Sequence, residues 1–386
     1  MANTLTGLIP TLYEALDVVS RELSGFIPAV TWDREAERAA VNQDVTVPIT
    51  PAAAAADITP GVTPPNDGDQ TIGNTVVRIT KSRRVPVRWN GEEQRGVNSG
   101  PGYQNILRDQ FAQAMRTLVN EIEVDVGLAA KVAASRAHGT AGTAPFGSTP
   151  GIGDLADVLK ILEDNGCPGS DLQAVINTAA ATNLRKLGNL YKINESGENR
   201  LLRQGVLGDL YGFALRASAG VAAHTKGTGA SATTDNAGYA VGSTVITLAS
   251  AGTGAIVAGD VITFAGDSNK YVVVAGDADV SGGGTITLAA PGLRQALAAS
   301  TVAITVGNNY AANAAFHRSS LILVTRAPAV PEEGDLAVDR MIVTDPVTGL
   351  SFEISKYLQY RQVQYEIAAA WGVKGIKPEH AATLLG

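Results

Sequence analysis

The pattern of apolar and polar positions changes from helical to extended early in the chain. Over residues 10–24 apolar side chains recur every three or four positions, which predicts a short amphipathic helix. Its stripe consists of Leu12, Leu16, Val19 and Leu23. It either docks onto its own domain or forms an arm that seeks a partner.

Residues 41–89 predict a long, thin two-stranded excursion. Apolar positions alternate over 41–49 and again over 74–89, and the connection 51–70 is rich in Pro, Gly and Asp. A hairpin of this kind is marginal alone in water, so we expect it to lie on something else. The second strand carries a basic cluster of Lys81, Arg83, Arg84 and Arg88. The cluster is either a solvated strand face or a surface that complements acidic groups of a neighbouring subunit.

The longest helical pattern covers residues 102–137 without a proline. A helix of about 35 residues spans roughly 50 Å, which suits a thin, wide subunit better than a small sphere.

The segment 150–220 contains both helical and extended patterns. We expect a helix ending at Gly166, a strand over 174–176, a helix from Asn177 or Thr178 to Gly188, and two strands around a turn at Gly208–Asp209.

Residues 219–316 differ in composition from the rest of the chain. Eight of these 98 positions are charged, against 17% for the whole chain. Short β-rich runs separated by turn residues predict a small antiparallel barrel or sandwich, inserted into a parent fold that resumes near 317. The runs are 243–248, 260–265, 270–275, 284–289 and 300–306.

Composition excludes several classes of protein. The chain has 386 residues, 45% of them apolar, and a net charge of −7. It is neither a disordered chain nor a basic nucleic-acid-binding module. One cysteine allows no internal disulfide and suits a reducing cytoplasm. We recognise no secretory signal and no apolar run of about 18 residues that would cross a membrane.

No motif in the sequence predicts catalysis, a cofactor or a metal. The nucleophile-elbow and phosphate-loop patterns are absent from the sequence, and its four histidines lie far apart. Cys167 lies in a turn, and the Gly151–Gly153–Ala156 pattern lacks the strand that a dinucleotide site requires. Asp277 and Asp279 faintly match a calcium loop, but the downstream Glu is missing. An acidic, charge-poor chain with a long arm and a long helix points to an assembly protein.

Three segments carry a family resemblance. They are LLRQGVLGDLYGFALRAS, AAFHRSSLILVTRAP and GLSFEISKYLQYRQVQYEIAAAWGVKGIKPEHAATLL. Together with the order of elements they resemble the major capsid protein of tailed double-stranded DNA bacteriophages, an α+β protein with the Hong Kong phage capsid fold. The inserted β-rich segment is similar to the β-barrel insertion of one podovirus branch.

The resemblance implies a structural, non-enzymatic role without cofactors. Copies would form the pentamers and hexamers of an icosahedral shell that encloses double-stranded DNA without recognising it. A separate scaffolding protein and a portal would assist assembly in the host cytoplasm, and no membrane would be involved. A surface-layer or adhesin-type β-rich protein is the alternative, and a hydrolase with an accessory β domain ranks third.

The resemblance also divides the chain. The expected parts are an N-terminal arm (1–40), an extended hairpin loop (41–95), a spine helix with a peripheral domain (96–149), an apical domain (150–218), an inserted β-barrel (219–316) and return strands of the apical and peripheral domains (317–386). The inter-subunit contact candidates are Lys81, Arg83, Arg84 and Arg88.

Overall fold

The structure is a computed structural model that describes residues 22–33, 37–50, 53, 55–63, 68–97, 103–147, 151–191, 208–345 and 348–386. The predicted helix over 10–24 lies outside the described residues except for positions 22–24, which are not helical. None of the helices in the described ranges is long and apolar enough to cross a membrane.

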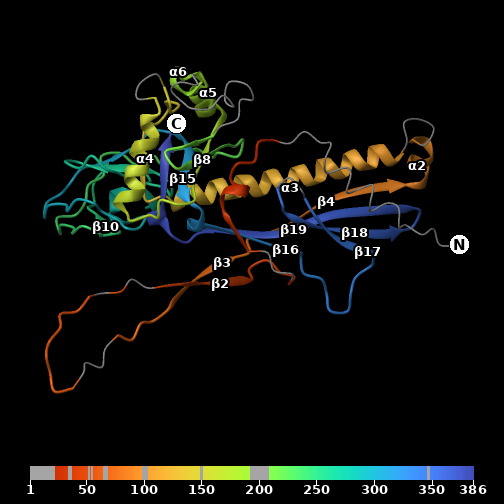
Figure 1. The fold of residues 1–386 in the computed structure, drawn as a ribbon, viewed down its shortest axis with the longest axis horizontal. Helices are drawn as coiled ribbons and strands as arrows, with labels where there is room; N and C mark the ends of the chain where they lie inside the picture. The colour runs from red at the N-terminus through yellow and green to blue at the C-terminus, as the bar shows by residue number, and fades with distance from the viewer. Residues whose placement is uncertain are drawn as a thin grey trace.

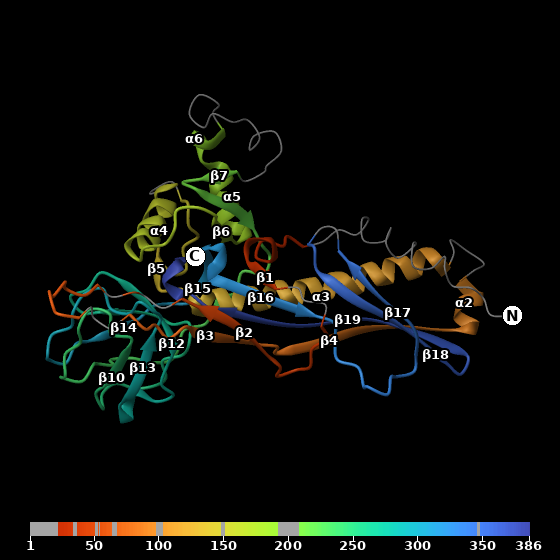
Figure 2. The ribbon, with the colours of Figure 1, turned by 60° about the horizontal axis from the view of Figure 1, so that its bottom comes forward.

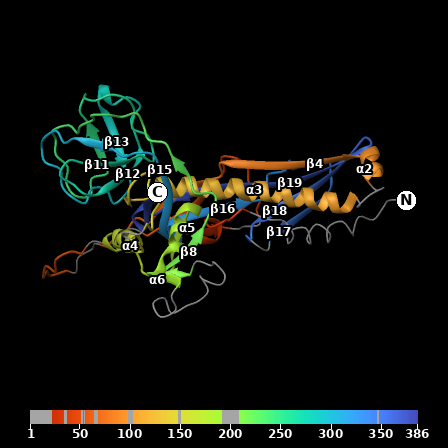
Figure 3. The ribbon, with the colours of Figure 1, turned by 90° about the horizontal axis from the view of Figure 1, so that it is seen from above.

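A single long helix, α3 (Tyr103–Ala133), runs along the molecule (Figures 1 and 3). Its 31 residues span roughly 46 Å. The buried stripe repeats at helical spacing through Phe111, Met115, Leu118, Ile122 and Val126. The helix is shorter than the pattern 102–137 predicts, because strand β5 (Arg136–His138) instead pairs in parallel with the C-terminal strand. The elongated shape expected from the sequence is therefore present.

One face of α3 packs on a six-stranded sheet. Its order is β1 (Thr31–Asp33), β16 (Leu321–Arg326), β19 (Gln362–Gly375), β18 (Ser351–Gln359) and β17 (Ala337–Thr344), with β4 (Lys81–Asn90) also paired to β19. The largest core cluster fills the space between helix and sheet, with Trp371 and Phe352 fully buried. Figure 2 places β17 and β18 at the end of the molecule away from strands β10–β14.

Residues 41–89, predicted as a two-stranded excursion, form three strands. Strands β2 (Asp44–Ile49) and β3 (Gly73–Arg78) form a separate hairpin, whereas β4 pairs with β19 and leads into helix α2 (Gly91–Val97). The chain changes partner at Ile79–Thr80: Ile79 N–H donates to Gln43 O, and Thr80 N–H donates to Trp371 O. Alternation continues through this change of partner, so the sequence pattern did not reveal it.

The second sheet has twelve strands. Its central path runs β10 (Val245–Leu248), β13 (Gly284–Leu288), β12 (Lys270–Ala275), β5, β20 (Ala381–Leu385), β15 (Tyr310–His317), β6 (Leu172–Ile176), β8 (Phe213–Ala217) and β7 (Asp209–Leu210). Off this path are β9 (Ala223–His224), β11 (Val261–Phe264) and β14 (Ile304–Val306). Helices α4 (Gly153–Asp164), α5 (Thr178–Lys186) and α6 (Gly188–Tyr191) lie beside the β6–β8 part, as Figure 1 shows.

Local expectations for the segment 150–220 are mostly met. Helix α5 begins at Thr178, and the Asn177 side chain caps it by accepting from Ala180 N–H at 2.8 Å. The expected turn at Gly208–Asp209 is wrong, because the turn between β7 and β8 is Tyr211–Gly212. Both turn residues have positive φ, 50° and 79°, as a type I′ turn requires. The first residues of the quoted segment, up to 207, lie outside the described residues.

The five β-rich runs of residues 219–316, here called the insert, all contain strands. The segment 232–235 bonds to β10 on one side and to residues 302–304 on the other, so the hydrogen bonds run around a closed circuit. The parent sheet resumes at Tyr310, before the boundary expected at 317, because β15 pairs with β6 and β20. The insert also continues the parent sheet, since β12 pairs with β5 through Lys270 and Tyr271.

Candidate assembly surfaces

The described residues of the loop between β2 and β3 contribute nothing to the core of their own subunit. Every described residue from 55 to 63 and from 68 to 72 is exposed. Ile58, Val62 and Ile72 are 97%, 105% and 71% exposed, although they are large apolar side chains. In all three overall views the loop extends toward the insert end of the molecule, away from β17 and β18 (Figures 1–3). Exposed apolar side chains on an extended arm are typical of a surface that another chain covers.

The base of this hairpin is fixed firmly. Val77 and Ile79 are fully buried in a small cluster that also contains Ala370. Gly372 approaches the Arg78 backbone so closely that a Cβ at 372 would lie 2.1 Å from the Arg78 carbonyl oxygen. The glycine of the Trp-Gly-Val segment therefore allows the hairpin to lie against β19.

Strand alternation divides the basic cluster on β4 between two faces. Lys81 and Arg83 lie on the α3 side, where the Lys81 ammonium is 3.0 Å from Glu121 and 2.8 Å from Asp125. The Arg83 guanidinium is 3.3 Å from the same Glu121 carboxylate. Burial opposes the charge on Lys81, but its two carboxylate partners outweigh that effect and raise its pKa.

Arg84 and Arg88 point to the opposite face of the sheet. Arg84 donates to Glu366 of the adjacent strand at 2.7 Å. Arg88 is exposed and has no ion-pair partner among the residues that the structure describes. Arg83 and Arg84 also remain 58% and 56% exposed. Three of the four predicted contact residues thus have partners within the subunit and Arg88 has none described, so contact with another subunit remains a proposal.

Two buried polar contacts, unforeseen from the sequence, join distant segments to α3. The Glu123 carboxylate accepts from the N–H groups of Gly25, Phe26 and Ile27 and from the Ser218 hydroxyl. Farther along the helix, Lys131 Nζ lies 3.3 Å from Nδ1 of His224, whose Nε2 is 2.8 Å from Asp260. Burial lowers the pKa of Lys131 and raises that of Tyr310, whose ring packs 5.0 Å from His224.

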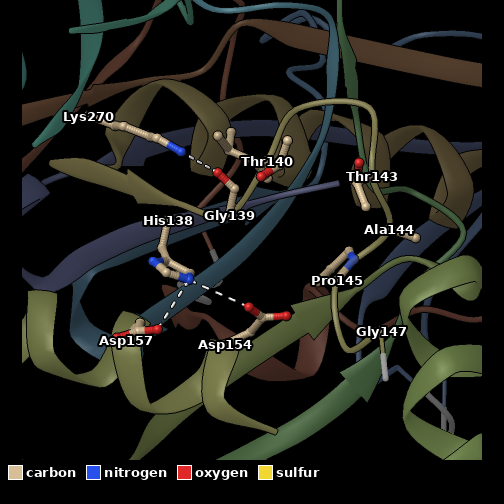
Figure 4. A pocket seen from close by; sticks show the side chains of 11 residues that line it. His138, Gly139, Thr140, Thr143, Ala144, Pro145, Gly147, Asp154, Asp157 and Lys270 are labelled. Carbon is tan, nitrogen blue, oxygen red and sulfur yellow. Dashed lines mark hydrogen bonds and ion pairs between the residues drawn. The ribbon is translucent and has the colours of Figure 1, made fainter. Parts of the chain in front are cut away.

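A hollow of about 330 Å³ lies where β5, the N-terminal end of α4, Lys270 and Leu385 meet. Figure 4 shows His138 between two carboxylates, with Nε2 at 3.5 Å from Asp154 and 3.3 Å from Asp157. Lys270 donates to the Gly139 carbonyl. Asp154 also accepts from Phe146 N–H at 2.8 Å, so it fixes the loop 139–147. These contacts hold the insert, β5 and α4 together.

The other sequence candidates have structural roles. Asp277 and Asp279 accept backbone N–H groups two residues ahead of each, as turn-forming carboxylates do. Burial raises the pKa of the Cys167 thiol to about 11, the opposite of an activated nucleophile. Within the described part of the chain no group of three or more His, Cys, Asp or Glu side chains could hold a metal ion.

Comparison with known proteins rests on structure. No family model matches the chain, and no curated protein matches it in sequence. The mature capsid of bacteriophage PhiM1 is similar, with 12% identity, a TM-score of 0.50, and coverage of 96% of this chain and 89% of that one. The capsid of cyanophage P-SCSP1u has 13% identity, a TM-score of 0.49 and coverage of 100% and 92%.

The PhiM1 similarity defines the fold. The architecture is that of a viral capsid subunit, an α+β protein with a spine helix and an extended hairpin. More narrowly, it is the capsid fold of tailed bacteriophages, which confirms the fold expected from the sequence resemblance.

Proposed function

We propose that this chain is a major capsid protein, many copies of which assemble into a closed shell around double-stranded DNA. The observation that carries the proposal is the hairpin loop, which presents Ile58, Val62 and Ile72 to solvent from a base buried in the subunit. Ordering such an arm costs conformational entropy that contacts with its own subunit do not repay. Contacts with neighbouring copies would repay it.

The role proposed is structural and not catalytic. The three polar clusters described above have packing roles: Glu123 and Lys131 join segments to α3, and His138 holds α4. Pentamers and hexamers are the expected arrangement, assembled with a separate scaffolding protein and a portal in the host cytoplasm and ending as the virion capsid. The basic cluster at Lys81, Arg83, Arg84 and Arg88 would contribute contacts with acidic groups of another subunit, chiefly through Arg88.

Electron microscopy of the purified protein, alone and with its scaffolding protein, tests this function. Closed shells or capsomers are expected. Sheets or filaments would instead support the surface-layer alternative. Deleting residues 54–66 should abolish particles and leave the melting temperature of the subunit nearly unchanged, because the described loop residues are exposed. An equal loss of particles and of melting temperature would show that the loop stabilises the subunit itself.

Charge reversal tests the basic strand. Exposed ion pairs contribute only about 0.2–1 kcal/mol each, but an assembly repeats them. Arg88→Glu should raise the protein concentration needed for assembly, more strongly at low salt. If the concentration needed for assembly does not change, Arg88 does not contribute to the interface.

The enclosed DNA would be confined and not recognised. The chain carries a net charge of −7, whereas a protein that grips DNA makes many basic phosphate contacts. Binding of unassembled subunits to duplex DNA should be weak and should vanish with added salt. Micromolar, sequence-dependent binding near physiological salt would overturn this part of the proposal.

A further inference from the structure

A chain of three side chains, here called the joint, connects the insert to the spine helix. Lys131 lies near the C-terminal end of α3, His224 on β9, and Asp260 directly before β11. Lys131 Nζ is 3.3 Å from His224 Nδ1, and His224 Nε2 is 2.8 Å from Asp260 Oδ1. His224 is 4% exposed and Asp260 is fully buried. Figure 3 shows the strands of the insert beside this end of α3.

The donors and acceptors of the joint define where the imidazole proton of His224 lies. An ammonium group only donates hydrogen bonds, so Nδ1 of His224 carries a lone pair that accepts from Lys131. The imidazole proton is therefore on Nε2, which donates to Asp260. An imidazolium, with a proton on each nitrogen, could not accept from Lys131.

The charges of the joint balance only while His224 is neutral. One ammonium group, on Lys131, is matched by one carboxylate, on Asp260, whose oxygens also accept the N–H groups of Gly227 and Val257. Protonation of His224 would leave two cations against one carboxylate in a buried site, which is costly. Burial already lowers the pKa of Lys131, although Asp260 opposes that shift.

Tyr310 of β15 is the remaining titratable group that faces His224. Its ring packs 5.0 Å from the imidazole, and its hydroxyl donates to the Gly259 carbonyl at 2.6 Å. Burial raises the pKa of Tyr310, so the hydroxyl stays uncharged and supplies no second anion. The joint therefore has no further group to compensate a second cation.

We propose that the joint is an acid-sensitive brace, which releases the insert from the spine helix when His224 takes up a second proton. Histidine is the side chain whose charge ordinarily changes between pH 5 and 8. Protonation removes the acceptor of Lys131 and places two cations 3.3 Å apart. The insert would then be held chiefly by the pairing of β12 with β5, about which it would pivot. This inference goes beyond the proposed function, because it concerns the single subunit.

Amide hydrogen exchange of the unassembled full chain, followed by mass spectrometry at about pH 7.5 and about pH 5.5, tests the brace. After correction for intrinsic exchange rates, protection of residues 223–227 and 257–260 should fall by about fivefold or more in acid, the lower end of typical coupling between sites. Protection of β6 in the parent sheet should fall far less. Unchanged protection at the joint, or an equal loss in β6, would overturn the inference.

Two variants separate the acid response from simple packing. His224→Gln removes the group that takes up the proton, and Lys131→Met removes the second cation but keeps a long side chain. Both should abolish the pH-dependent loss of protection. A loss that persists in both variants would show that another group senses the acid.

Each variant has a matched control. His317→Gln replaces a histidine on β15 outside the joint, and Lys226→Met replaces an exposed lysine two residues after His224. Both controls should lose protection in acid as the unmodified chain does. If they abolish the acid response as fully as His224→Gln and Lys131→Met do, the response does not depend on the joint and the inference fails. Failure of the chain to form shells would contradict the proposed function and leave this result unaffected.

Discussion

The carboxylate of Glu123, in the middle of α3, accepts the backbone N–H of Phe26 at 2.7 Å across 97 positions of sequence. Glu123 is 3% exposed, and the neighbouring N–H groups of Gly25 and Ile27 point to the same carboxylate. Gly220 makes the approach possible, since a Cβ there would lie 2.7 Å from the Glu123 side chain. The first described segment of the chain is thus anchored at one fixed point on the spine helix.

Glu123→Ala should destabilise the subunit by about 3 kcal/mol, because it leaves several buried N–H groups without an acceptor. It should also expose residues 22–30 to proteases. Chemical denaturation and limited proteolysis measure the two effects. Asp109→Asn, at an exposed position of the same helix, is the control and should change stability by less than about 0.5 kcal/mol.

Gly372→Ala should destabilise by about 2–4 kcal/mol, because the new methyl group meets the Arg78 carbonyl and forces the base of the hairpin away from β19. Gly91→Ala is the matched control, since a Cβ at position 91 has no atom within 4 Å. Thermal unfolding of both variants checks this expectation. Equal melting temperatures would show that the close approach is easily relieved.

The stability of the subunit should fall as the pH drops below about 6.5, partly through His380. Burial lowers the pKa of His380, assisted by the positive charge of Lys377 and by His317, while Glu379 opposes the shift. The unfolded chain then takes up a proton at a higher pH than the folded chain, so acid favours unfolding. His380→Gln should flatten the pH dependence of the unfolding free energy. An unchanged slope in His380→Gln would exclude this residue as the cause.

Cys167 should react slowly with thiol reagents. Its pKa of about 11 lies two units above the reference value of 9.0, so near pH 8 the thiolate fraction is about 100-fold lower. Alkylation with iodoacetamide should therefore be about 100-fold slower in the folded protein than in denaturant. Comparable rates in the two states would show that the thiol is neither buried nor electrostatically suppressed.

The insert should fold when residues 219–316 are expressed alone, because it has its own buried core around Ile246, Ile262, Tyr271 and Ile286. Dispersed amide signals and a cooperative melt are expected. Stability should be lower than within the whole chain, since β12 loses its pairing with β5. An unfolded spectrum would mean that the parent sheet is needed as a template.

The sequence predicts the regular elements well and their partners poorly. The spine helix, the helix start at Asn177 and the five β-rich runs follow from local periodicity and capping. The sequence places strand β4 in the hairpin, whereas it pairs with β19, because alternation does not specify which neighbour a strand pairs with.

For the candidate surfaces, the sequence found the residues but not their surroundings. It locates the arginines of β4 but not their partners, because Glu121 beside Arg83 and Glu366 beside Arg84 come from elements far away in the sequence. The contacts of Glu123 and Lys131 are not predicted from the sequence, since the groups that meet these side chains come from distant segments.

The pairing of β12 with β5, followed by β20 and β15, has a mechanical consequence. A load applied to the insert passes through a continuous ladder of hydrogen bonds into the centre of the parent sheet, with the Lys131–His224 contact as a second brace against α3. We therefore expect the insert to move together with the parent sheet, so that a force on the insert would also displace the spine helix.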